Sequence, residues 1–124
     1  MALRKIPANR IGSHYSPTLV ASTNVNTVTL RDAFYAVTGQ CVQVYAAVQI
    51  DPVATGFIAF RASLPFGIEI LAESDCIGTT GTKGSPAQGG TVAGDIASNQ
   101  VLINGQVGAA IPTDIYFHFG YILR

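Results

Sequence analysis

Apolar and polar side chains alternate along most of this chain, most clearly over residues 41–50, CVQVYAAVQI. Side chains of a β-strand point to opposite faces in turn, so this stretch predicts a strand. One face is aliphatic throughout and consists of Val42, Val44, Ala46, Val48 and Ile50. The other face is mixed and consists of Cys41, Gln43, Tyr45, Ala47 and Gln49. Such a strand belongs in the middle of a sheet, and we expect its mixed face to be covered.

The same alternation predicts further strands on both sides of this stretch. They span residues 18–25, 27–31, 33–38, 56–64, 74–82, 91–97, 100–104 and 114–123. Gly39-Gln40 predicts a two-residue hairpin turn of type II′, and Asn104-Gly105 predicts another turn. Pro52 closes the central strand because proline cannot donate to the ladder. The last strand contains an aromatic stripe for the core, and Tyr116 and His118 lie opposite that stripe.

No segment of eleven or more residues has helical periodicity. Eight or nine short strands separated by turns predict an all-β domain, which we expect to be an antiparallel β-sandwich of jelly-roll type. The domain is expected to span residues 18–124. Residues 1–17 form an extended N-terminal arm, because Pro7, Gly12 and Pro17 interrupt both strand and helical patterns there.

The composition favours an assembly over a monomer. Of the 124 residues, 48% are hydrophobic and only 11% are charged, against about 25% charged in an average domain. So few charges leave a small monomer with apolar patches, so we expect a homo-oligomer. The candidates for the subunit interface are Gln43, Tyr45, Gln49, Tyr116 and His118.

The charges are unevenly placed although the formal net charge is zero. A neutral chain creates no field that favours nucleic acid or a membrane, and we expect neither as a partner. Basic residues without acids nearby occur in the first ten positions, so we expect the arm to contact a partner. The residues expected to make this contact are Arg4, Lys5, Ile6 and Arg10.

The histidines and acidic residues do not form a catalytic or metal-binding motif. The residues two positions from His118 are Tyr116 and Gly120, which are poor metal ligands. Glu69, Glu73 and Asp75 lack the spacing of a calcium loop and are expected to be a solvated cluster. His14 lies in the arm, far from these groups in sequence.

Nucleophile and phosphate motifs are missing as well. Residues 78–85, GTTGTKGS, lack the Gly-Lys-Ser/Thr ending of a phosphate loop, and no serine occurs in a G-x-S-x-G pattern. Cys41 and Cys76 are expected to be buried thiols, and a disulfide between them stays open. We therefore expect no enzymatic activity, no cofactor and no metal.

Residues 15–66, from YSPTLVASTNVNTVTLRDAFYAVTG to FIAFRASLPF, resemble small β-sandwich domains of tailed-phage virions. The resemblance rests on the P-T-L segment, the Asn-rich turn, the aromatic pair Phe34 and Tyr35, the turn at Gly39, the V-x-V-x strand and the Leu64-Pro65 ending. The last strand, IYFHFGYIL, is similar to theirs. The pair Ala46-Ala47 departs from the Ser-Gly or similar pair that these domains often carry.

The resemblance implies a homotrimeric virion appendage, such as a capsid decoration protein, a head fibre or a tail-fibre tip. Its N-terminal segment would attach to a major capsid or tail protein. The alternative is a carbohydrate-binding module of a tail fibre, with the loops at residues 83–90 and 52–56 reading a host surface glycan.

Overall fold

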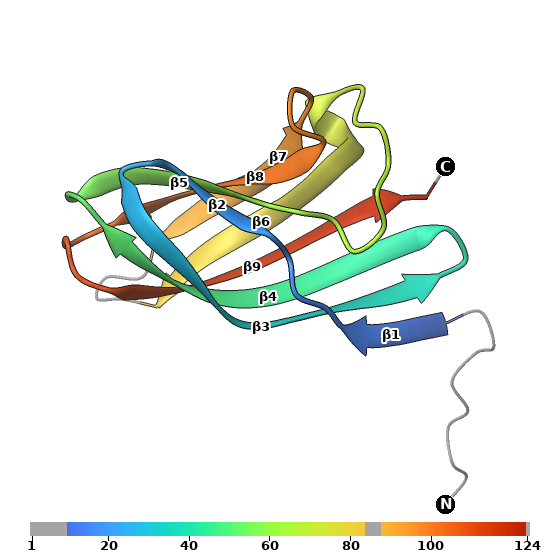
Figure 1. The fold of residues 1–124 in the computed structure, drawn as a ribbon, viewed down its shortest axis with the longest axis horizontal. Coiled ribbons are helices and arrows are strands. Elements are labelled where there is room, and N and C mark those ends of the chain that lie inside the picture. The colour runs from blue at the N-terminus through green and yellow to red at the C-terminus, as the bar shows by residue number, and fades with distance from the viewer. Residues whose placement is uncertain (1–9, 84–87, 124) are drawn as a thin grey trace, which may run out of the picture.

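The computed structural model describes residues 10–83 and 88–123, which form nine strands and one short 3₁₀ turn (Figure 1). The strands are β1 Arg10–His14, β2 Leu19–Thr23, β3 Val25–Thr38, β4 Cys41–Pro52, β5 Gly56–Ala62, β6 Cys76–Lys83, β7 Gly89–Asp95, β8 Gln100–Val107 and β9 Thr113–Ile122. The turn η1, Glu73–Asp75, precedes β6. In the described ranges, no helix is long and apolar enough to cross a membrane.

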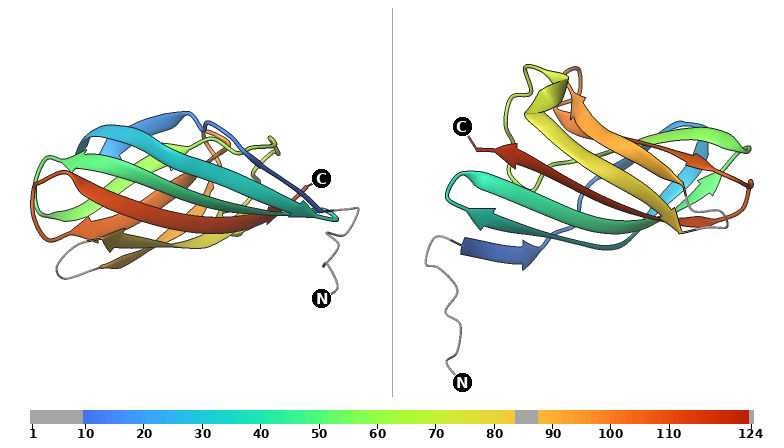
Figure 2. Two further views of the ribbon diagram at one scale, coloured as in Figure 1. Left: turned by 90° about the horizontal axis from the view of Figure 1, so that it is seen from below. Right: turned by 180° about the vertical axis from the view of Figure 1, so that it is seen from behind.

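All nine strands belong to one sheet with the order β1-β3-β4-β9-β6-β7-β8-β5-β2, and every neighbouring pair is antiparallel. The sheet curls on itself, so that β5 and β2 lie across from β3 and β4 (Figure 2). The prediction of an all-β antiparallel domain is confirmed. The two-sheet sandwich of jelly-roll type is not confirmed, because the sheet is continuous.

The core fills the inside of the curl. The aliphatic face of β4 is buried as predicted, and the aromatic stripe of β9 packs beside it with Phe119 fully buried. The inward side chains of β5 and β8 come from the opposite wall, where Phe60 meets Phe117 edge to face at 5.8 Å. Because β4 and β9 are paired along their full lengths, their other faces form one continuous outer surface.

β3 is one long strand over the residues where the sequence predicted two strands, 27–31 and 33–38. A β-bulge at Arg31 lies where the prediction divided them. Leu30 pairs with Val48 and Asp32 pairs with Ala47, so two residues of β3 oppose one residue of β4. The bulge shifts the alternation by one position, which lets Leu30 and Ala33 both face the core. Without knowledge of a bulge, this change of parity looks like the end of one strand and the start of another.

Residues 10–14 of the predicted extended arm form β1, which pairs with the end of β3 from Phe34 to Thr38. The prediction of a turn at Asn104-Gly105 is wrong, because these residues lie inside β8, where Gly105 pairs with Ile58 and is packed into the core. The Gly39-Gln40 connection is a two-residue hairpin as predicted, with Gly39 at a φ of 61°.

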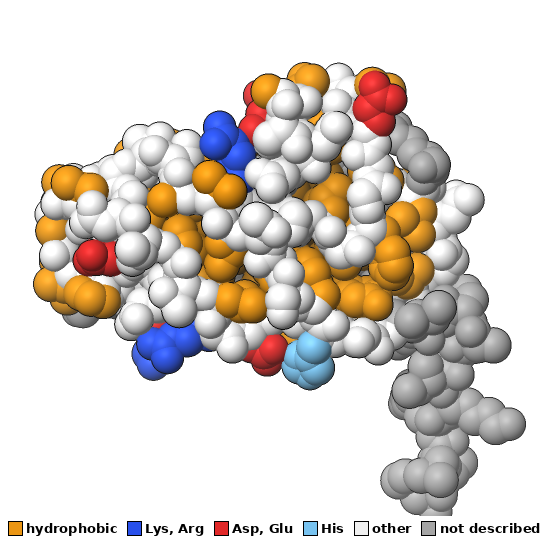
Figure 3. Space-filling model, viewed as in Figure 1, with side chains coloured by type: hydrophobic (Ala, Val, Ile, Leu, Met, Phe, Trp, Pro, Cys, Tyr) orange, Lys and Arg blue, Asp and Glu red, His pale blue; other side chains and the backbone are white. Residues whose placement is uncertain are grey.

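Residues 63–72, here called the cover segment, close part of the open side of the curl. Ile68 and Ile70 of this segment are buried, and the Tyr121 hydroxyl hydrogen-bonds to both the backbone nitrogen and the backbone oxygen of Phe66. Figure 3 shows hydrophobic side chains still visible on this side, while charged side chains lie mainly at its edges. The curled sheet is therefore a half-barrel, and a loop rather than a strand closes part of its open side.

Candidate functional site

The outward side chains of β3, β4, β9 and β6 form one surface, here called the outer face. The five predicted interface residues, which are Gln43, Tyr45, Gln49, Tyr116 and His118, all lie on it. The pairing of β4 with β9 places Tyr45 directly opposite His118 and Gln49 opposite Asp114. The structure thus brings together residues that are up to 75 positions apart in the sequence.

Four rings cross the outer face in a line, here called the aromatic row. It consists of His14, Phe34, Tyr45 and His118, one from each of β1, β3, β4 and β9. Phe34 stacks on Tyr45 with 5.2 Å between ring centroids, and Tyr45 stacks on His118 at 4.6 Å. Directly paired residues of neighbouring strands lie about 4.5–5.5 Å apart, so the pairing itself sets this spacing.

A hydrogen bond fixes the His118 ring at its end of the row. Nε2 of His118 donates to Oε1 of Gln43 at 2.7 Å. The amide of Gln43 lies over Gly120, where a Cβ would stand 2.9 Å from its nitrogen. The missing side chain at Gly120 therefore gives Gln43 the space to reach His118.

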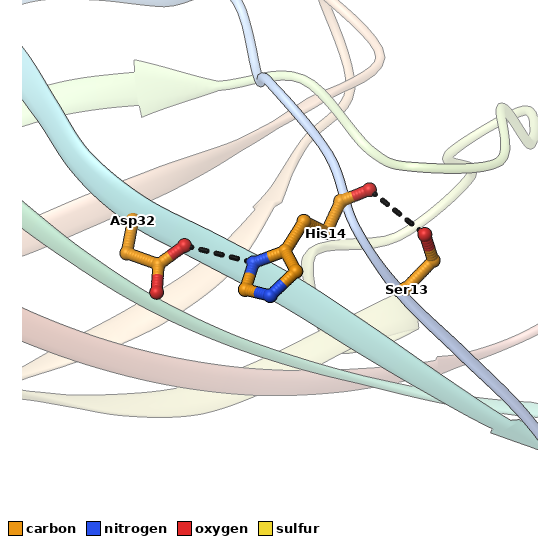
Figure 4. A network of polar contacts seen from close by, with 3 residues as sticks. All are labelled: Ser13, His14 and Asp32. Atoms are coloured by element: carbon orange, nitrogen blue, oxygen red, sulfur yellow. Dashed lines mark hydrogen bonds and ion pairs between the residues drawn. The ribbon is translucent and has the colours of Figure 1, made fainter.

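At the other end of the row, His14 bonds to Asp32 on the neighbouring strand β3 (Figure 4). Nδ1 of His14 and Oδ1 of Asp32 are 2.9 Å apart, and both side chains are exposed. Exposed pairs of this kind stabilise by at most about 1 kcal/mol, so the contact orients the ring more than it stabilises the fold.

A hollow of about 520 Å³ lies on the outer face beside the aromatic row. Its lining includes Tyr45 and His118 of the row, together with Asp32 and Tyr116. The cross-strand neighbours of Tyr116 are Ala47 on β4 and Gly81 on β6, which are too small to cover its ring. The hollow exists because these two neighbours are small.

Several large apolar side chains are exposed on the outer face. Of the twelve exposed ones in the described residues, five lie on this face, and these are Phe34, Tyr45, Ile77, Tyr116 and Ile122. Contiguous exposed apolar surface marks a site of interaction with another molecule. The other seven are distributed over loops, turns, β2 and β5.

Ser13, His14 and Asp32 are close neighbours but do not form a nucleophilic triad. Figure 4 shows the Ser13 hydroxyl directed at the backbone oxygen of His14, 3.2 Å away, and not at its ring. Among residues 10–83 and 88–123, no group of three or more potential metal ligands occurs.

The residues predicted to contact a partner through the arm cannot be compared with this surface. Arg4, Lys5 and Ile6 lie outside the described residues, and the backbone of Arg10 belongs to β1. Cys41 and Cys76 are not joined by a disulfide. Of the loops proposed for glycan contact, residues 52–56 do not line the hollow, and residues 84–87 are outside the described part of the chain.

The sequence reading missed Phe34 and the hollow. Phe34 could have been found only by placing β3 in register with β4, which the bulge obscured. The signal for the hollow is the pair of small residues, Ala47 and Gly81, that flanks Tyr116, but this signal needs the strand order β4-β9-β6. No protein-family profile, curated protein or solved structure matches the chain.

Proposed function

We propose that this chain is a non-enzymatic structural protein that assembles with copies of itself through the outer face. The resemblance to tailed-phage virion domains supports a role for this assembly as a capsid decoration or fibre-type appendage of the virion, and the homotrimer that the resemblance implies is one form that the assembly could take. The arm would anchor it to a capsid or tail protein through Arg4, Lys5, Ile6 and Arg10.

The observation that carries this proposal is the exposure of apolar rings on the outer face of a protein with few charges. Phe34, Tyr45 and Tyr116 are 43%, 42% and 48% exposed although their β-strands are fully paired. Removing apolar surface from water gains roughly 25 cal/mol per Å², which offsets the entropy lost on association. A second copy that covers these rings would remove their apolar surface from water.

A matched pair of substitutions tests whether the outer face is the contact. Ile77 on the outer face and Ile111 in the loop before β9 are 64% and 60% exposed, so neither supports the core. Ile77→Lys is expected to raise the dissociation constant of the assembly at least tenfold in sedimentation equilibrium, and Ile111→Lys is expected to leave it unchanged. Equal effects of the two substitutions would remove the outer face as the contact.

The anchoring role is tested separately by deleting residues 1–9, which leaves β1 in place. The shortened chain is expected to fold and assemble as before but to fail to co-sediment with particles that bind the full chain. Normal co-sedimentation of the shortened chain would refute attachment through the arm.

The hollow favours a second candidate, a carbohydrate-binding module. Both faces of the Tyr116 ring lack an aromatic neighbour in the described residues, and flat aromatic faces pack on sugar rings. The hollow also has the size of sites that hold small molecules, about 300–1,000 Å³. Host glycans that bind to the wild-type chain and not to Tyr116→Ala on a glycan array would favour this candidate.

A further inference from the structure

We infer that the copy covering the outer face is related to the first by a twofold axis close to Tyr116. The Tyr116 ring of each copy then enters the hollow of the other. This inference rests on the proposed self-association and specifies its geometry, which is a closed pair of subunits rather than a ring of three.

Tyr116 is the projecting part of the contact. It points outward from the middle of β9, and its hydroxyl has no hydrogen-bond partner among the described residues. It also takes no part in the aromatic row, whose stacking holds Tyr45 and His118. A tyrosine with an unpaired hydroxyl and an uncovered ring is the kind of side chain that anchors protein interfaces.

The hollow is the receiving part and lies against the same residue. Ala47 and Gly81 flank Tyr116 within one row of paired residues. A Cβ added at Gly81 would meet nothing within 4 Å, so the space beside the ring is open. The volume of about 520 Å³ is sufficient for a phenol ring.

The Tyr116 ring and the hollow lie next to each other, and this favours twofold over threefold symmetry. In a twofold contact, the same patch of both subunits meets itself, so a projection and its receptor must lie together on that patch. In a ring of three, each subunit uses two different patches, so projection and receptor would lie apart. Tyr116 lines the hollow that it would fill in a second copy, which is the twofold arrangement.

The outer face is smaller than a standard subunit interface. From β3 to β6 it crosses three strand spacings of about 4.8 Å, and from Asp114 to Ile122 it spans eight residues of about 3.3 Å each. The projected area is therefore roughly 400 Å², against ~800 Å² per partner of a standard interface, so the twofold contact depends on the fit of Tyr116 to the hollow more than on area.

The charges on the outer face do not oppose contact with a second copy. Asp32 pairs with His14, and Asp114 lies 3.7 Å from the Arg31 guanidinium. Like charges placed opposite each other would cost several kcal/mol, but two of the three acidic groups on this face, Asp32 and Asp114 but not Asp51, already have basic neighbours.

Filling the hollow without touching Tyr116 tests the inference. Ala47→Leu adds bulk to the floor of the hollow from an outward position of β4. Gln106→Leu adds similar apolar bulk at an exposed position of β8, away from the outer face, and is the matched control. Sedimentation equilibrium is expected to give a wild-type mass of twice 13.0 kDa and at least tenfold weaker association for Ala47→Leu alone.

The outcomes separate the inference from the proposed function. A wild-type mass of three subunits, or a dimer that Ala47→Leu leaves intact, would overturn the twofold contact and leave self-association standing. A monomer would overturn both. A folded monomer that binds glycans through Tyr116 would assign the hollow to a saccharide.

Cross-linking gives a second measurement in case Ala47→Leu fails to fold. In a Cys41→Ser background, Gly81→Cys places one thiol of each copy beside Tyr116 and keeps the projecting ring, and a bismaleimide joins the two thiols by adding each one across a maleimide double bond. We expect a band at twice 13.0 kDa for this variant and none for Phe57→Cys, an exposed position on β5. An assembled Gly81→Cys protein that does not cross-link would contradict the inference.

Discussion

The rings of Tyr45 and His118 stack at a centroid distance of 4.6 Å and an angle of 20° between their planes. They come from directly paired positions of β4 and β9, the two strands at the centre of the outer face. The row that they belong to holds exposed aromatic side chains in one arrangement before any partner arrives. A surface ordered in this way loses little side-chain entropy on binding, which favours a stable contact.

The stack itself can be measured by a double-mutant cycle of Tyr45→Ala and His118→Ala. Aromatic pairs contribute about 0.5–1.5 kcal/mol beyond their burial, so we expect a coupling of about that size in urea unfolding. Tyr45→Ala and Ile111→Ala lie on different surfaces and are expected to be additive. A Tyr45–His118 coupling below about 0.3 kcal/mol would show that the two rings are neighbours without mutual stabilisation.

Two glycines of β6 are expected to respond oppositely to alanine. A Cβ at Gly78 would overlap the backbone oxygen of His118 and the Cα of Phe119, which cannot move without disturbing the β6–β9 ladder. Gly78→Ala should therefore destabilise by about 1–3 kcal/mol. Gly81→Ala meets open space and should change the free energy of unfolding by less than about 0.5 kcal/mol. Urea midpoints that are equal for the two variants would contradict this close approach.

Acid stability should depend on Asp95. Hydrogen bonds from Ser98 and then Arg61, whose Nε lies 2.7 Å from Oδ2, hold the pKa of Asp95 below its usual value of 3.8. The unfolded chain therefore binds the proton more readily, so this stabilisation is present above the usual pKa and is lost as the pH falls through the folded value. Asp95→Asn should flatten the decline of unfolding free energy below about pH 4, whereas the exposed control Glu73→Gln should retain it. Identical acid profiles for Asp95→Asn and the wild type would refute the coupling.

The Tyr121 hydroxyl should hold the cover segment. It donates to the backbone oxygen of Phe66 at 2.8 Å and accepts from the Phe66 nitrogen at 3.0 Å. Tyr121→Phe leaves both groups without this partner and should cost about 1–3 kcal/mol of unfolding free energy. Faster hydrogen exchange across residues 63–72 is the specific sign of the lost contact. Unchanged exchange there would show that the segment is held by its other contacts.

Alkaline stability should depend on the same tyrosine. Burial raises the pKa of Tyr121 to about 12 and also raises the pKa of Tyr15. A raised folded pKa means that the stabilisation is complete below about pH 10 and is lost as the pH rises towards 12. Circular dichroism should therefore show a steeper loss of structure over this range in the wild type than in Tyr121→Phe. Equal slopes would contradict the assignment.

Strict alternation made part of the fold predictable. The two faces of β4 and the aromatic stripe of β9 are as the sequence indicates, because both strands lie centrally and face the core along their full length. β3 was divided in two because the bulge at Arg31 changes which positions face inward. The pattern of apolar residues shows that the inward-facing positions shift by one residue there, but it does not show that a bulge causes the shift.

The candidate site was less predictable than the strands. Sequence reasoning could assign Tyr45 and His118 to outward faces, since each alternates with core residues. It could not make them neighbours, because that requires β4 to pair with a strand 60 or more residues away. The strand β1 was missed for a similar reason, as its pairing with β3 depends on long-range contacts and not on the local pattern of residues 10–14.

The mass of the purified chain in solution is the most direct test of self-association through the outer face. Light scattering at neutral pH should give at least twice the subunit mass of 13.0 kDa for the wild type and a lower mass for Ile77→Lys at the same concentration. A wild-type mass of 13.0 kDa across the accessible concentrations would contradict the proposal and leave the exposed rings of the outer face to a different partner.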